Sequence, residues 1–253
     1  MRGPTLPGSP ARIQRKRGRD ASAALARRPL LPHAPAFGLP GETRDVPANL
    51  TAHSARDPRW RRVQQFTAAE LPAACRRWLL DDDSLTARLI ALDAGRFNVL
   101  RLDQGWQVPL PSEQALLQVP PRQRALVREV LLRLDERAVV FARSVFPISS
   151  LGGELAHLRK LRNRSLGAIL FRFPAMQRSP FELARLAGDS AYMAPWIHQQ
   201  DDAWARRSCF DIRGKRLLVS EVFLQGFNPW DATLPVHRSR RGKVSAAIGG
   251  VNQ

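Results

Sequence analysis

Cysteine is scarce in this sequence, since its 253 residues include only Cys75 and Cys209. Two cysteines cannot form a disulfide framework, and they cannot build a structural zinc site by themselves. Long apolar runs are also missing, because stretches such as Ala138 to Ala142 fall far short of the roughly 18 residues needed to span a bilayer. These absences argue against a disulfide-stapled secreted module and a transmembrane protein. They predict a reducing, cytoplasmic location without stable membrane insertion.

Acidic residues are few compared with basic ones, at 22 Asp and Glu against 40 Lys and Arg, which gives a formal net charge of +18. Residues 1–60 hold 11 basic and 4 acidic residues, and residues 231–253 hold 4 and 1, so more than half of the excess lies near the ends. No helix-turn-helix, zinc-finger or RNP-type pattern accompanies this charge. The sequence therefore predicts no nucleic-acid partner, although a basic nucleic-acid-binding protein remains an alternative.

Hydrophobic periodicity is confined to the middle of the chain. Residues 1–57 are rich in Pro, Gly, Ala and Arg, and residues 231–253 lose the pattern again. The overall content of 44% hydrophobic and 25% charged residues is typical of a chain that folds at least in part. We expect a basic, disordered extension over 1–57, one folded domain over 58–230, and a flexible basic tail over 231–253.

Three capping patterns predict helices. Thr67 with Glu70 forms a capping box, flanked by Phe66 and Leu71 in the positions of a hydrophobic staple. The expected buried stripe of that helix also includes Cys75, which we interpret as a core residue rather than a nucleophile. The other members of the stripe are Leu71, Trp78 and Leu79.

The second helix is expected to begin at Ser84 and to run through Leu92. The third is expected from Ser179 through Ala187, because serine, proline and glutamate occupy the cap, first and third positions of a helix start. Residues 188–203 contain Gly, Pro and Asp and predict a loop with mobility.

Strands are predicted at about 125–134, 138–146 and 216–224, and a further one near Phe97 to Leu102. The first two are separated by the short polar segment 135–137, which favours a hairpin. We therefore expect an α+β fold, with a single antiparallel sheet and helices packed on one face.

Each of three predicted strands places one charged residue in an otherwise apolar row. Side chains alternate along a strand, so Arg128, Arg143 and Glu221 each share a face with aliphatic or aromatic residues. An unpaired buried charge is very costly, so these groups must meet one another, water or an ionic ligand. One interpretation is a pocket for a small acid, in which arginine binds a carboxylate and Glu221 binds a hydroxyl. The other is a structural Arg–Glu pair, and the pattern leaves both open.

Other candidate groups carry weaker signals. His157 and His198 have no third ligand at metal-binding spacing, so we interpret both as surface histidines. Arg206 and Arg207 precede a predicted strand and could bind an anion, although a solvated strand entry is the simpler interpretation. We expect neither a metal nor covalent catalysis.

Six segments in register resemble the chorismate lyase family, whose members act in ubiquinone biosynthesis. Their order and spacing hold from about Phe66 to Leu224, and both tails lie outside this region. The segments are Trp78-Leu79-Leu80 with Asp83-Ser84-Leu85-Thr86, Val127-Arg128-Glu129-Val130-Leu131-Leu132, Ala142-Arg143-Ser144-Val145-Phe146-Pro147, Arg164-Ser165-Leu166-Gly167, Trp204-Ala205-Arg206-Arg207-Ser208, and Gly214-Lys215 through Ser220-Glu221-Val222-Phe223-Leu224.

The resemblance implies an internal pocket formed by an antiparallel sheet and helical flaps. By resemblance, Arg128 binds the ring carboxylate and Glu221 the ring hydroxyl, and these two are the expected catalytic residues. Leu85 and Leu166 match positions whose backbone groups contact the ligand, and Arg143 matches a second basic position near the pocket.

The reaction that the resemblance implies converts chorismate to 4-hydroxybenzoate and pyruvate, with no cofactor and no metal. The expected partners are therefore chorismate and 4-hydroxybenzoate, and we expect a monomer. A closed pocket that fits the planar product predicts slow product release.

Two departures from the family pattern concern the backbone. Arg162-Asn163 stands where the family often has glycine, and Gln225 stands where proline is common. The segment from Gly188 to Ala203 is longer than in short family members.

The nearest rival function is a non-catalytic, small-acid-sensing domain of the same fold, as found in some transcription regulators.

Overall fold

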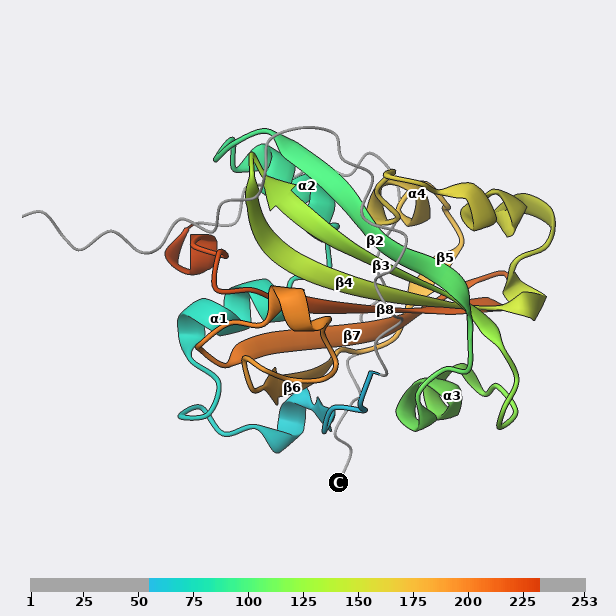
Figure 1. The fold of residues 1–253 in the computed structure, drawn as a ribbon, viewed down its shortest axis with the longest axis horizontal. Helices are drawn as coiled ribbons and strands as arrows, with labels where there is room; N and C mark the ends of the chain where they lie inside the picture. Colours follow the sequence, from blue (N-terminus) through green and yellow to red (C-terminus); the bar gives the residue numbers. More distant parts are fainter. Residues whose placement is uncertain (1–54, 233–253) are drawn as a thin grey trace, which may run out of the picture. The chain divides into compact units, whose positions relative to one another are not determined.

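The computed structural model describes residues 55–232, which form an antiparallel sheet of eight strands with short helices (Figure 1). The strand order is β1-β6-β7-β8-β4-β3-β2, and β5 pairs with β7 beside this path. The α+β fold class predicted from the sequence is confirmed. The strands are β1 (Arg61–Arg62), β2 (Phe97–Gln107), β3 (Ala125–Leu134), β4 (Arg137–Pro147), β5 (Met176–Arg178), β6 (Glu182–Leu186), β7 (Ala203–Ile212) and β8 (Lys215–Phe223).

The helices are all short. The α-helices are α1 (Ala73–Leu79), α2 (Leu85–Ala91), α3 (Pro111–Leu117) and α4 (Gly167–Leu170). Short 3-10 segments are η1 (Val63–Gln65), η2 (Ile148–Ser150), η3 (Gly153–Lys160), η4 (Pro195–Ile197) and η5 (Pro229–Asp231). Within the described residues, every helix is too short or too polar to cross a membrane.

The hairpin of β3 and β4 lies inside the sheet, between β8 and the edge strand β2, and confirms the prediction for residues 125–146. Asp135 adopts a left-handed backbone conformation, with φ of 52°, in the tight turn between the two strands. In the resulting register Arg128 lies opposite Ser144, and Glu129 lies opposite Arg143. Arg128 and Arg143 therefore point to opposite faces of the sheet, because side chains alternate along each strand.

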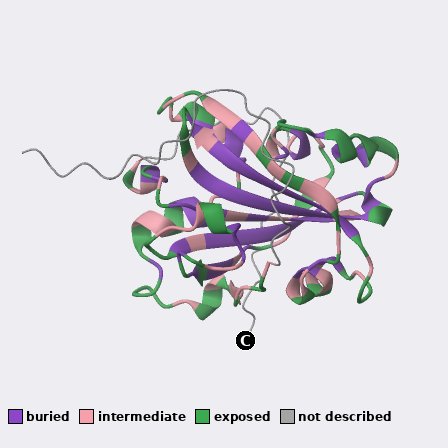
Figure 2. Cartoon of the chain, in the orientation of Figure 1, coloured by how far each residue is buried: buried purple, intermediate pink, exposed green. Residues whose placement is uncertain are grey.

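Both faces of the central strands are covered, which is why β3 and β4 are buried along nearly their whole length (Figure 2). On one face, α1 and α2 pack Leu79 and Leu89 against Val130 of β3. On the other face, α3 packs Leu117 against Val127. The predicted helical layer on one face is present, and α3 adds cover to the second face.

The start of α1 departs from the sequence expectation. The capping box forms, since the Thr67 backbone N–H donates to Glu70 Oε2 at 2.8 Å and the Glu70 N–H donates to Thr67 Oγ1 at 3.2 Å. However, it closes an isolated turn, and the α-helix begins at Ala73 after Pro72. Proline fits the start of a helix but not its interior, so the helix restarts behind it. The predicted stripe is confirmed, because Leu71, Trp78 and Leu79 are buried and Cys75 packs against them.

The helix predicted from Ser84 is confirmed, with Ser84 Oγ accepting from the Ala87 N–H at 3.3 Å. The helix predicted from Ser179 is wrong, because Glu182–Leu186 forms strand β6. Ser179 instead joins β7, where its N–H donates to the Cys209 carbonyl and its hydroxyl accepts from the Cys209 N–H, both at 2.9 Å. Pairing with a long neighbouring strand outweighs a local capping pattern in so short a segment.

The predicted loop over 188–203 contains no α-helix or strand before Ala203, as expected. It is held against the second face of the sheet by the buried side chains of Tyr192 and Met193. Its ends meet where the Gln199 N–H donates to the Gly188 carbonyl at 3.0 Å. A β-carbon on residue 188 would lie 2.1 Å from the Gln199 carbonyl oxygen, so this close approach requires glycine.

The predicted tails fall almost entirely outside the described residues. At the first boundary, Asp57 already belongs to the folded part, because its carboxylate accepts from the Ser112 N–H at 2.7 Å. At the second boundary, Trp230 packs against Phe223 and Phe227 with ring centroids 5.2 and 4.7 Å apart. The domain limits of 58–230 therefore remain a prediction, with folded contacts at both ends.

Candidate functional site

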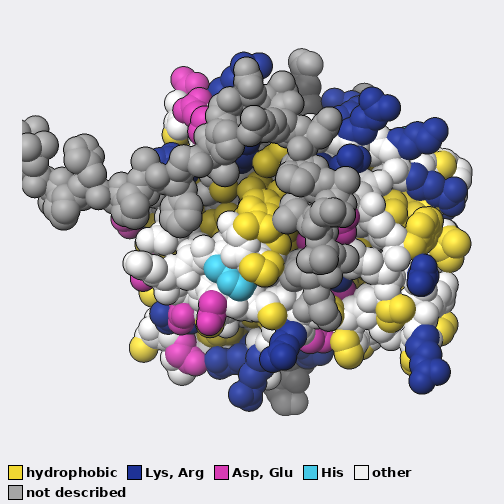
Figure 3. All heavy atoms as spheres, in the orientation of Figure 1, with side chains coloured by type: hydrophobic (Ala, Val, Ile, Leu, Met, Phe, Trp, Pro, Cys, Tyr) yellow, Lys and Arg dark blue, Asp and Glu magenta, His cyan; other side chains and the backbone are white. Residues whose placement is uncertain are grey.

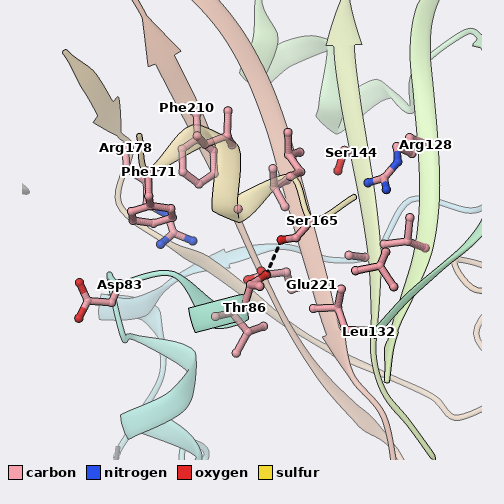
Figure 4. Close-up of a pocket in the computed structure, with 18 residues that line it drawn as sticks. Asp83, Thr86, Arg128, Leu132, Ser144, Ser165, Phe171, Arg178, Phe210 and Glu221 are labelled. Carbon is pink, nitrogen blue, oxygen red and sulfur yellow. Dashed lines mark hydrogen bonds between the residues drawn. The ribbon is translucent and has the colours of Figure 1, made fainter. Parts of the chain in front are cut away.

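A pocket lies between the sheet and the first residues of α2 and α4 (Figure 4). The space of the pocket, counted together with the open solvent at its mouth, is about 510 Å³. Its floor consists of side chains from β2, β3, β4, β7 and β8. The lining residues are Asp83, Leu85, Thr86, Val99, Arg128, Val130, Leu132, Ala142, Ser144, Ser165, Leu166, Gly167, Leu170, Phe171, Arg178, Phe210, Val219 and Glu221.

Arg128 is a buried cation of this pocket, and its side chain is only 2% exposed. Its Nη2 donates to the backbone carbonyls of Arg162 and Arg164, both at 2.9 Å. Among the described residues, no carboxylate lies within ion-pair distance of it, and its Nε is buried without a hydrogen-bond partner. Burial, and to a lesser extent the nearby Arg101, lower the pKa of Arg128 to about 10. The site thus holds an arginine that a ligand carboxylate could neutralise.

Glu221 reaches the same pocket from β8, but its ion-pair partner is Arg206. The two residues lie directly opposite each other on β8 and β7, and Arg206 Nε donates to Glu221 Oε2 at 2.7 Å. Arg206 is itself fixed by the carbonyls of Trp78 and Asp81, at 2.7 and 2.8 Å. Glu221 Oε1 makes no hydrogen bond within the described part of the chain and is left as an acceptor for a ligand hydroxyl.

Arg143 does not belong to this pocket, which corrects the expectation that it lies near the ligand. It lies on the opposite face of the sheet, where Glu113 of α3 accepts from its Nε at 2.8 Å and Glu129 accepts from its Nη1 at 2.7 Å. Burial by itself would lower the pKa of Arg143, but the two carboxylates and Tyr192 outweigh burial and raise it. The structural Arg–Glu pair left open by the sequence pattern is therefore present, at Arg143 rather than at Arg128.

The interpretation of Arg206 and Arg207 as a solvated strand entry is also wrong, because both residues are buried. Their exposed fractions are 1% and 4%, and both lie inside β7. Arg206 faces the pocket side and pairs with Glu221, whereas Arg207 faces the other side and pairs with Glu182 at 2.7 Å. Adjacent residues of a central strand point to opposite buried faces, so each arginine needs its own carboxylate.

Leu85 and Leu166 both line the pocket, at the first turns of α2 and α4. The two segments are joined where Thr86 Oγ1 and Ser165 Oγ lie 2.8 Å apart, the contact that Figure 4 marks with a dashed line. Gly167 permits this approach, since a β-carbon there would lie 3.3 Å from Ser84 Oγ.

Arg178 is a pocket residue that the sequence analysis missed. It ends the three-residue strand β5, which is too short to show an alternating pattern, and it directly precedes the capping pattern at Ser179 that we interpreted as a helix start. Its guanidinium lies 4.1 Å from the centroid of Phe181 and 4.8 Å from that of Phe210. Burial, followed by repulsion from Arg206, lowers the pKa of Arg178 to about 9.

The two departures from the family pattern have structural explanations. Arg162 adopts the left-handed conformation with φ of 49°, which glycine would adopt without strain, and its carbonyl supports Arg128. The Gln225 N–H donates to Gln199 Oε1 at 2.8 Å, a bond that a proline could not make. Both departures leave the lining of the pocket intact.

The remaining candidates lie outside the pocket. Burial raises the pKa of the Cys75 thiol, and it raises that of the Cys209 thiol to about 11, which suits inert core cysteines. His157 is exposed and contacts the Glu154 carbonyl, whereas His198 is half-buried. No group of three or more metal-ligating side chains occurs among the described residues.

Solved structures with a related arrangement are regulator domains. The effector domain of PhnF from Mycobacterium smegmatis is 13% identical, and the match covers 56% of this chain and 88% of that one, with a TM-score of 0.39. Full PhnF from the same organism is 12% identical, with 58% and 65% coverage and a TM-score of 0.43. Likeness at this level does not assign a function to the present chain.

Sequence relatives are much closer. Proteins named probable chorismate pyruvate-lyase are 37% identical in Halorhodospira halophila, over 69% of this chain and 95% of the relative, and 40% identical in Pseudomonas aeruginosa, over 68% and 93%. The relative from Methylococcus capsulatus is 43% identical over 58% and 92%. The family model for chorismate lyase matches residues 56–232, which include every residue of the pocket. The chain therefore belongs to the chorismate lyase family.

Proposed function

We propose that this protein is a chorismate–pyruvate lyase, which converts chorismate to 4-hydroxybenzoate and pyruvate for ubiquinone biosynthesis. The observation that carries the proposal is a pocket, in a member of this family, whose buried Arg128 has no carboxylate partner within residues 55–232. A cation that the protein leaves unneutralised in a small pocket is suited to an anionic ligand.

In the proposed complex, Arg128 binds the ring carboxylate through the guanidinium nitrogens that its carbonyl partners leave unused. Glu221, oriented by Arg206, accepts a hydrogen bond from the ring hydroxyl through Oε1. Backbone groups of Leu85 and Leu166 contact the ring from α2 and α4. These contacts fix both ends of the ring, so that the bond to be broken is held in one orientation.

The chemistry is an elimination. The bond between ring carbon 3 and the enolpyruvyl oxygen breaks, the hydrogen on carbon 4 leaves as a proton, and the ring becomes aromatic. The departing enolpyruvyl group takes up a proton on its terminal carbon and becomes pyruvate, so atoms and electrons balance without an added reagent. Aromatisation supplies the driving force, and the proposal therefore needs no cofactor or metal. The residues act by orienting the substrate and stabilising the charge that develops on the leaving oxygen.

The proposal also includes a monomeric, cytoplasmic protein without a nucleic-acid partner. Both cysteines are free thiols, which is typical of a protein in a reducing compartment. On the face shown in Figure 3, the Lys and Arg side chains lie in separate groups near the edges. On the visible part of this face in Figure 3 these groups are separate, whereas a continuous basic stripe typically follows a nucleic-acid backbone.

The direct test is incubation of the purified chain with chorismate, without added metal, while 4-hydroxybenzoate and pyruvate are both followed by chromatography. We expect the two products in equal amounts. Saturable binding of 4-hydroxybenzoate without turnover would contradict the lyase and support the small-acid sensor. Absence of both binding and turnover would contradict both functions and direct attention to the basic ends of the chain.

A further inference from the structure

We propose that Arg178 binds the carboxylate of the enolpyruvyl group of chorismate and so forms the second anion subsite of the pocket. This inference rests on the proposed lyase reaction and assigns a residue to the part of the substrate that leaves as pyruvate. Chorismate carries two carboxylates, one on the ring and one on the enolpyruvyl ether, whereas 4-hydroxybenzoate retains only the first.

The charges that line the pocket match a dianion. Four lining residues are charged: Asp83, Arg128, Arg178 and Glu221. Both carboxylates are paired with arginines outside the lining, Asp83 with Arg88 and Glu221 with Arg206. Neither lining arginine has a carboxylate within ion-pair distance among the described residues. The pocket therefore presents two cations that the described part of the chain does not pair with a carboxylate.

The contacts of Arg178 orient its guanidinium and leave one nitrogen unused. Nε donates to Ser208 Oγ at 2.8 Å, and Nη1 donates to the Asp82 carbonyl at 3.1 Å. Nη2 has no hydrogen-bond partner in the part of the chain that the structure describes. Phe210 and Phe171, which also line the pocket, lie 4.8 and 6.0 Å from the guanidinium carbon. An oriented arginine in an apolar wall interacts strongly with an incoming carboxylate.

The position of Arg178 fits the geometry of the substrate. In Figure 4, Arg178 and Arg128 lie at opposite sides of the pocket, and Glu221, Thr86 and Ser165 lie between them. If Arg128 holds the ring carboxylate and Glu221 the hydroxyl on carbon 4, the neighbouring carbon 3 points its ether away from Arg128. The enolpyruvyl carboxylate then lies on the side of Arg178, where the cation also stabilises charge on the departing oxygen.

Negative groups around Arg178 offset part of its charge. Glu221, Asp81 and Asp82 each favour its charged form, although none comes within ion-pair distance. Repulsion from Arg206 and burial act in the opposite direction and dominate. A substrate carboxylate would therefore relieve an unfavourable environment, which is the condition for a ligand-binding arginine rather than a structural one.

The test compares substrate and product in one variant. We expect Arg178→Gln to lower kcat/KM for chorismate by about 100-fold or more, because a charge-assisted contact to the leaving group is lost. The dissociation constant of 4-hydroxybenzoate should change by less than about threefold, because the product lacks the second carboxylate. Arg178→Lys should recover part of the activity, and the exposed Arg185→Gln should match the wild type in both measurements.

The outcomes separate this inference from the lyase function. Wild-type kcat/KM in Arg178→Gln, or equal losses for chorismate and 4-hydroxybenzoate, would overturn the second subsite and leave the lyase in place. Absence of turnover in the wild type would instead overturn the function itself.

A second measurement needs no variant and covers the case in which Arg178→Gln fails to fold. The wild-type chain is titrated with 4-hydroxybenzoate bearing a 3-carboxymethoxy group, and with the 3-isobutoxy analogue, which has the same shape without the charge. We expect at least tenfold tighter binding of the carboxylate. Equal or weaker binding of the carboxylate would overturn the proposal.

Discussion

The two faces of the sheet treat buried arginine in different ways. On the face beneath α3, Arg143 is paired with Glu113 and Glu129, and Arg207 with Glu182. On the pocket face, Arg206 is paired, but Arg128 and Arg178 have only neutral hydrogen-bond acceptors among the described residues. Arg143 has a raised pKa, whereas Arg128 and Arg178 have lowered ones. Burial alone therefore does not distinguish the two groups of arginines, whereas the presence of a carboxylate partner does.

The largest expected effect is a loss of stability when an ion pair on the face beneath α3 is removed. Arg143→Met removes the cation that pairs with the buried carboxylates of Glu113 and Glu129, and should lower the free energy of unfolding by about 3–5 kcal/mol. Urea denaturation measures this loss, with Arg185→Gln as the control, for which an exposed pair predicts about 1 kcal/mol or less. The turnover per folded molecule should stay within about threefold of the wild type. A large loss of turnover in the folded variant would place Arg143 in the site after all.

On the pocket face the same kind of change should affect binding rather than folding. Arg128→Gln should lower kcat/KM by about 100-fold or more, since it removes the cation for the ring carboxylate. It should also weaken the binding of 4-hydroxybenzoate, because this product retains the ring carboxylate. The change at Arg178 should not have this effect. Arg101→Gln removes a nearby cation that does not line the pocket and serves as the control. Unfolding of Arg128→Gln with normal kinetics in the folded fraction would identify a structural arginine.

A matched pair of glutamates sharpens the comparison, because each is bound to an arginine of β7. Glu221→Gln on the pocket face should lower kcat by about 10-fold to 100-fold, since it weakens the acceptor for the ring hydroxyl. Glu182→Gln on the other face should lower the melting temperature and leave kcat nearly unchanged. Steady-state kinetics and thermal denaturation of both variants provide the check. If the two variants behaved alike, the division between the faces would not hold.

The smallest expected effect concerns Arg162, whose backbone carbonyl accepts a hydrogen bond from Arg128. Arg162→Gly should relieve the left-handed backbone strain and raise the free energy of unfolding by about 1 kcal/mol. Its carbonyl would still accept from Arg128, so kcat/KM should stay near the wild-type value. Chemical denaturation and kinetics measure the two quantities, with Arg164→Gly as a control that lacks the positive φ. A stability loss at position 162 would show that the Arg162 side chain contributes more than its conformation costs.

Parts of the fold followed from local patterns in the sequence. The limits of β3 were predicted to the residue, because a long run of aliphatic side chains is buried on both faces. The Ser84 cap was also predicted, since its bond to the Ala87 N–H depends only on neighbouring residues. By contrast, Ser179 carries an equally good capping pattern but pairs with β7, a partner about 30 positions away. A local pattern cannot show which distant strand competes for the same backbone groups.

The residues of the candidate site were likewise predicted only in part. Residue types and spacing singled out Arg128 and Glu221 as charges in apolar rows, and the family likeness added Leu85 and Leu166. Alternation within each strand could not show that Arg143 faces away from them, because this depends on the register between β3 and β4. Nor could it reveal Arg178, whose place in the pocket depends on a three-residue strand at the edge of β7.

The sequence by itself determined the antiparallel sheet and the need to neutralise three charges in apolar rows, because these follow from side-chain alternation and the cost of burying ions. The likeness of six sequence segments indicated the family. Only the tertiary structure decided which charges meet. Pairing across strands gave Arg143 its two carboxylates and gave Glu221 the partner Arg206. Arg128 and Arg178 were left facing one cavity without carboxylates among the described residues, since ion pairing depends on distances of a few ångströms between residues far apart in the chain.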